Sequence, residues 1–87
     1  MKIKEPYSLV VIRWEDHCAN SAWETPKEAA DAAVGIFDTV GWLVAEDRKK
    51  VVVCQCIEIG GDKLVGNRST IIKKNIVARH EIVMDKE

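Results

Sequence analysis

The chain has 87 residues, which is near the size at which one hydrophobic core is only just sufficient for a domain. Hydrophobic residues make up 47% and charged residues 31%, a balance that excludes intrinsic disorder, and the net charge of −1 argues against a protein whose main task is to grip nucleic acid. Three cysteines, an odd number, and the lack of a long apolar run predict a reduced cytoplasmic protein without a signal peptide or membrane span.

The first expected strand is Ser8–Asp16, because its apolar side chains alternate. Leu9 and Val11 point to one face of this strand. Val10, Ile12 and Trp14 point to the other face, and a polar loop, 17–22, follows.

The sharpest local signal is Thr25-Pro26-Lys27-Glu28, a capping box with proline at the first helical position. It predicts a helix that runs to about Asp38. Small alanines would let this helix lie close on a sheet, and its apolar stripe consists of Ala29, Ala33, Ile36, Phe37 and Val40.

Four further strands are expected, at 42–45, after Gly41 restarts the chain, and at 50–59, 69–73 and 76–83. A charged turn, 46–49, a glycine-bracketed loop, 60–67, and a tight turn, 74–75, separate them. The central strand, 50–59, is apolar on both faces, with Val51, Val53 and Ile57 on one and Val52, Cys54 and Cys56 on the other. Since both faces need cover, we expect a partner chain to supply one, and therefore a homo-oligomer.

These elements predict a single α+β domain spanning 1–87. It would be a small five-stranded, mostly antiparallel sheet or an SH3/Sm-like barrel, with one helix after the first strand. An open sheet with the helix on one face is the alternative.

The side chains that could bind a soft metal ion are His17, Cys18, Cys54, Cys56 and His80. Cys-x-Cys on a strand is not the usual zinc spacing, so small core cysteines are the alternative interpretation. Both histidines are expected in solvent, and no glycine-rich loop precedes a helix. We therefore expect no metal, no cofactor and no catalytic group.

Three tryptophans, Trp14, Trp23 and Trp42, fit either a core or a stacking platform for a flat ligand. The basic residues Arg68, Lys73, Lys74 and Arg79 either guard a sheet edge or meet an anion. The resulting hypothesis is a pocket for an anionic, nucleotide-like molecule, with aromatic walls, a carboxylate acceptor and a cation, formed by Trp14, Asp16, Trp23, Lys73 and Arg79.

Four short motifs spread over most of the chain: Val11-x-x-Trp14-x-Asp16, Ser21-x-Trp23, Val40-Gly41-Trp42-Leu43-Val44-x-Glu46-Asp47 and Ile71-Ile72-Lys73-x-x-Ile76. With them the chain resembles a group of small phage and prophage proteins of unknown function, in which an Ile-Pro-Lys turn takes the place of Ile71-Ile72-Lys73. The resemblance implies a bacteriophage accessory protein in the cytoplasm of its bacterial host, and it implies no catalytic residues.

The function expected from these observations is non-enzymatic binding by a homo-oligomer. Its target would be a nucleotide-like host signalling molecule, which it sequesters, or a host defence protein, which it blocks. The alternative is an Sm-like RNA-binding oligomer, although nucleic acid is disfavoured by the acidic balance. A small enzyme that uses Cys18 or a metal ranks last.

Overall fold

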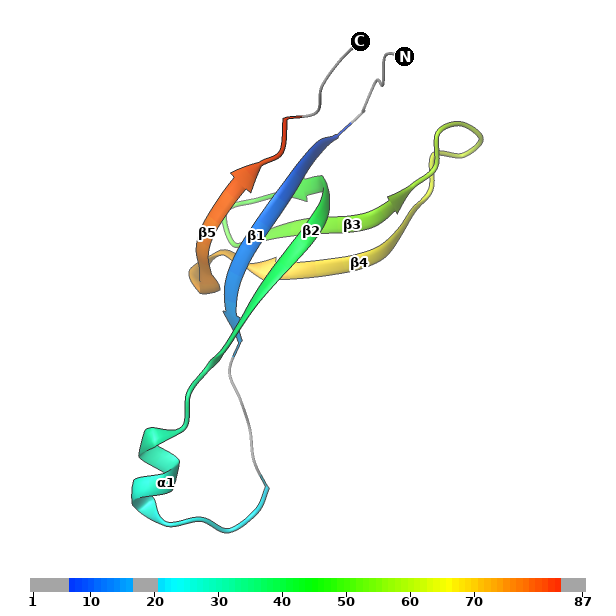
Figure 1. Cartoon of the computed structure of the whole chain (residues 1–87). Helices are drawn as coiled ribbons and strands as arrows, with labels where there is room; N and C mark the ends of the chain where they lie inside the picture. Colours follow the sequence, from blue (N-terminus) through cyan, green and yellow to red (C-terminus); the bar gives the residue numbers. More distant parts are fainter. Residues whose placement is uncertain (1–6, 17–20, 84–87) are drawn as a thin grey trace.

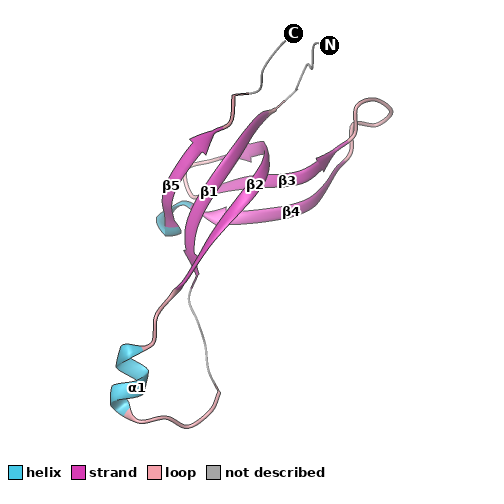
Figure 2. Ribbon diagram, viewed as in Figure 1, coloured by secondary structure: helices cyan, strands magenta, loops and turns pink. Residues whose placement is uncertain are grey.

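A computed structural model describes residues 7–16 and 21–83 of the chain. Its elements follow the predicted order of a strand, a helix and four more strands (Figures 1 and 2). They are β1 (Ser8–Asp16), α1 (Pro26–Asp31), β2 (Gly35–Glu46), β3 (Lys50–Ile57), β4 (Val65–Ile72), the 3-10 helix η1 (Lys73–Asn75) and β5 (Ile76–Glu81). The strands form one antiparallel sheet in the order β4-β3-β2-β1-β5, which confirms the predicted five-stranded α+β fold.

The sheet is curled. Strands β4 and β5 are its two edges, yet only η1 joins them. A connection of this length bridges at most about 15 Å, whereas the edges of a flat five-stranded sheet lie about 19 Å apart. The sheet therefore bends around its inner face, although closure of the predicted barrel by β4–β5 pairing is not shown for the described strands.

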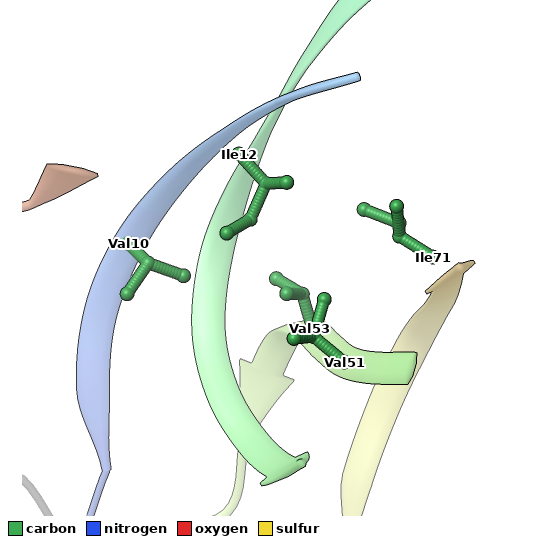
Figure 3. Packing of buried hydrophobic residues seen from close by; sticks show 5 residues of the cluster. All are labelled: Val10, Ile12, Val51, Val53 and Ile71. Atoms are coloured by element: carbon green, nitrogen blue, oxygen red, sulfur yellow. The ribbon is translucent and has the colours of Figure 1, made fainter. Parts of the chain in front are cut away.

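The core lies on the inner face of this curl (Figure 3). Trp14, Leu43 and Ile76 pack against it from β1, β2 and β5. Its buried members come from β1, β3 and β4, and are Val10, Ile12, Val51, Val53 and Ile71. With Cys54, they are the six buried hydrophobic side chains of the described residues, so this chain encloses a small core.

The helix prediction is right at its start and wrong at its end. Thr25 Oγ1 accepts a hydrogen bond from the Glu28 amide at 3.1 Å, and Glu28 Oε1 accepts one from the Thr25 amide at 3.2 Å. The helix stops at Asp31, however, and Ala32 is extended with φ −61° and ψ 128°. The segment expected to continue the helix instead begins β2 at Gly35.

Pairing with β1 explains this difference. The β1–β2 ladder runs from Ser8 opposite Leu43 to Asp16 opposite Gly35. Residues 36–40 are mostly β-branched or aromatic, and such side chains favour a pleated, half-buried surface. Phe37 also gains an aromatic neighbour opposite it, Trp14. Pairing with β1 therefore stabilises this segment as a strand more than the helical spacing of a few apolar residues stabilises it as a helix.

The helix also does not cover the sheet. All six residues of α1 are exposed, and Figure 1 shows the helix beyond the ends of β1 and β2, away from the rest of the molecule. The alternative fold, an open sheet with a helix on its face, is therefore wrong in the placement of the helix.

Several strand limits also differ from prediction. The middle strand is β2, not β3, and it passes through Gly41 without a break. Strand β3 ends at Ile57 rather than 59, β5 ends at Glu81 rather than 83, and β4 begins at Val65. Gly66 and Asn67 therefore lie within a strand and not in the expected loop.

Candidate binding surfaces

Lys73 and Arg79, the two cations expected at the ligand site, lie close together. Both of them bind the same carboxylate, that of Glu46. Arg79 donates to Glu46 through both terminal nitrogens, Nη1 to Oε2 and Nη2 to Oε1, each at 2.9 Å. Lys73 Nζ lies 2.7 Å from Glu46 Oε2. The three residues come from β2, η1 and β5, so this ion cluster connects the middle strand to the edge strand β5 and to η1, the link between the two edge strands.

The pKa of Glu46 is lowered from 4.5 to about 2, chiefly by the hydrogen bonds from Arg79 and then Lys73. The carboxylate is therefore ionised at neutral pH and offsets one of the two positive charges. An anionic ligand would have to compete with Glu46 for the same donors. This arrangement favours a structural role for the ion cluster, while ligand binding by Lys73 and Arg79 stays a prediction.

The tryptophans have separate surroundings. Trp14 is half-buried, its Nε1 donates to Thr39 Oγ1 at 2.9 Å, and its ring lies 5.4 Å from that of Phe37. This supports the core interpretation for Trp14, whose polar atom is satisfied. Trp23, in contrast, is fully exposed at 102%.

Asp16 is half-buried at the end of β1, opposite Gly35. Because Trp23 is fully exposed, it does not pack against Trp14 to form an aromatic wall. Within the described residues, Trp14 and Trp23 are thus not brought together, and a ligand site formed by Trp14, Asp16 and Trp23 stays a prediction.

A second ion pair, which the sequence did not suggest, lies between β1 and β2. Arg13 and Asp38 face each other across the ladder and form two hydrogen bonds, Nε to Oδ1 at 2.9 Å and Nη2 to Oδ2 at 3.0 Å. This pair lowers the pKa of Asp38 and raises that of Arg13, in both cases mainly through the side-chain hydrogen bond.

Two shallow grooves, of about 390 and 340 Å³, share the Arg13–Asp38 pair. One is lined with Ile36, Phe37 and Val77, and the other with Val11, Ala78, Arg79 and His80. His80 is exposed, as expected. These grooves are open depressions in which a ligand would remain largely in solvent, unlike an ordinary small-molecule pocket.

The cysteine prediction is half right. Cys54 is buried, at 1% exposure, whereas Cys56 is exposed. Cys56 lies farther along the β3–β4 ribbon opposite Gly66, which has no side chain to cover it. His17 and Cys18 lie outside the described residues, and within the described part of the chain no three His, Cys, Asp or Glu side chains are grouped to hold a metal ion.

The outer face of the sheet carries a row of apolar side chains across its strands. The ladders place Trp42 opposite both Leu9 and Cys54, and Val11 opposite Val40. Val40 is 45% exposed, Ile72 at the end of β4 is 56% exposed, and Val52 is half-buried. We call Val11, Val40, Trp42, Val52 and Ile72 the outer apolar face.

A second uncovered region is the segment 21–34, which we call the arm. It contains the fully exposed Trp23, all of α1, and Val34 at 51% exposure. Sequence reasoning missed its exposure by extending the helix and packing it on the sheet. A signal was present, because Pro26–Asp31 contains no large apolar side chain with which a helix could bind a sheet.

No protein-family model, curated protein or solved structure matches this chain. Among the described residues, no helix has the length and apolar character to cross a membrane.

Proposed function

We propose that this protein is a non-enzymatic binding protein that works as a homo-oligomer. The observation that supports the proposal is the outer apolar face, which crosses four strands of the sheet and stays partly open to solvent. Apolar side chains left exposed on one face of a sheet, as Val40 and Ile72 are, favour an interaction site.

The size of the core supports self-association. Six buried hydrophobic side chains are few for a chain of which 47% is hydrophobic. Full burial of a Val or Ile side chain stabilises by about 1.5–3 kcal/mol, and small domains have only about 5–15 kcal/mol of net stability. Covering Val40 and Ile72 with a second copy would therefore add substantially to the stability of the fold.

Within this proposal, the protein is a phage accessory protein in the cytoplasm of a bacterial host. Its target is a host defence protein or a nucleotide-like signalling molecule. The pairing of Lys73 and Arg79 with Glu46 favours the protein target over the small anion, because both cations already have a partner. The same pairing weakens the RNA-binding alternative.

The SH3- or Sm-like barrel also remains part of the proposal. It is supported by the β4-β3-β2-β1-β5 order and by η1, which brings the edge strands toward each other.

Multi-angle light scattering after size-exclusion chromatography tests the proposal. We expect the wild-type protein to be an oligomer at micromolar concentration, and Ile72→Glu to dissociate it because a charge would enter the covered face. Ile59→Glu is the matched control, since Ile59 is 75% exposed and lies outside the outer apolar face. A monodisperse wild-type monomer would overturn the proposal.

A further inference from the structure

We propose that the arm of one copy docks on the outer apolar face of a second copy, with Trp23 as its anchor. This inference rests on the proposed self-association and adds the contact by which it occurs. Both surfaces belong to the same chain, and each has apolar side chains exposed to solvent, Trp23 and Val34 on the arm and Val40 and Ile72 on the outer apolar face.

Local interactions stabilise the helix of the arm, although none of its residues is buried. A helix of six residues is unstable by itself in water. Here α1 has a complete capping box, proline in its first turn, and an ion pair from Lys27 Nζ to Asp31 Oδ2 at 2.9 Å. Such local stabilisation of an exposed element lowers the conformational entropy lost on binding, so the arm is preorganised for a partner.

The arm projects away from its own sheet. The β1–β2 ladder continues to Asp16 opposite Gly35, so the segment starts beyond the end of the sheet, as Figure 1 shows. Trp23 is fully exposed, whereas a buried tryptophan would remove about 150–250 Å² of surface from water. A second molecule is therefore needed to cover it.

The charges of the two surfaces are complementary. The arm carries Glu24, Glu28 and Asp31 against a single Lys27, which gives a net charge of −2. On the outer side of β3 and β4, the register places Lys50 opposite Ile72 and Arg68 opposite Cys54, and the described residues of these two strands include no carboxylate on that side. An acidic arm would thus meet a basic rim around apolar side chains.

The contact is close to the lower size limit of a stable interface, because each copy would contribute 14 arm residues and five residues of the outer apolar face, 19 in all. A stable interface buries about 800 Å² on each partner, from about 20–30 residues. The arm has 14 residues, and in a reciprocal dimer each copy contributes one arm and one outer apolar face. Two arm-to-face contacts per dimer would follow from twofold symmetry.

The first test compares Trp23→Ser with Ile59→Ser by light scattering and sedimentation. We expect Trp23→Ser to raise the dissociation constant by about 30-fold or more, as for a central anchor. Ile59→Ser, at an apolar site that is 75% exposed and lies outside both surfaces, should leave it within about 2-fold. If the wild type is an oligomer and Trp23→Ser stays equally associated, the arm contact is wrong and the proposed self-association stands. If the wild type is a monomer, both fail.

The second test is a charge exchange. Glu24→Arg and Arg68→Glu should each weaken association by about 5-fold, and the double variant should recover most of the loss, because the two charges would again be opposite. A double variant weakened by the product of the two single fold-changes would overturn docking of the arm beside Arg68. Circular dichroism of each variant establishes that the fold is retained.

Discussion

Gly41 lies where the neighbouring strand leaves no room for a side chain on β2. A Cβ at this position would stand 2.7 Å from Val53 Cγ1 and 2.8 Å from the carbonyl oxygen of Cys54. Ordinary carbon contacts are about 3.5–4.0 Å. The carbonyl is backbone, so it cannot rotate away as a flexible side chain would. We therefore expect Gly41→Ala to push β2 and β3 apart.

Gly66 provides a matched control. It too lies within a strand, and a Cβ there would meet only Cys56 Cβ, at 3.8 Å. Neither Gly41 nor Gly66 has a positive φ angle, so backbone conformation does not separate the two substitutions. The available space is the difference between them.

The expected change in unfolding free energy for Gly41→Ala follows from two opposing effects. Overpacking costs about 1–3 kcal/mol, and replacing glycine lowers the entropy of the unfolded chain by an amount worth about 0.4–1 kcal/mol. Gly41→Ala should thus lose about 1–2 kcal/mol of unfolding free energy, whereas Gly66→Ala should be neutral or slightly stabilising. With an m value of about 1–3 kcal/mol per molar urea, the midpoint of Gly41→Ala should fall by roughly 1 M.

Urea melts at one fixed protein concentration measure this difference, because self-association would make the midpoint depend on concentration. Coincident midpoints for the two alanine variants would refute the close approach of β2 and β3 at Gly41.

Four further outcomes are expected. Glu46→Gln should reduce the loss of stability between about pH 4.5 and 2. A carboxylate whose pKa is lowered on folding stabilises the fold at pH values above its ordinary pKa, and this stabilisation is lost as the pH falls toward the lowered pKa. An unchanged pH profile of stability would contradict the ion cluster. Thr25→Ala should weaken α1 by about 1 kcal/mol, because a first-turn amide loses its acceptor, seen as faster amide exchange in residues 26–31; unchanged exchange would contradict the capping box. Ile12→Ala should lose about 2–5 kcal/mol, measured by thermal melting, and a wild-type melting temperature would exclude Ile12 from the core. Cys56 should react with a thiol reagent in the native protein and Cys54 only after unfolding, as read by peptide mapping; equal rates would contradict their different burial.

Features encoded by neighbouring residues could be predicted from the sequence alone. The limits of β1 follow from its alternation, because side chains two apart share a face, and Val10 and Ile12 are indeed buried together. The capping box at Thr25 and Glu28 depends on four consecutive residues and was equally predictable. The order of the elements followed from these local patterns and from the turns between them.

Other features were decided only by the tertiary structure, because they depend on residues far apart in the chain. The end of α1 depends on β1, whose ladder draws Ile36 and Phe37 into a strand. Arg79, which was expected to bind a ligand, instead pairs with Glu46, 33 residues away. No local pattern in the sequence indicates this pairing. The exposure of Trp23 likewise depends on where the β1–β2 ladder ends, since the ladder carries the arm beyond the sheet that would otherwise have covered it.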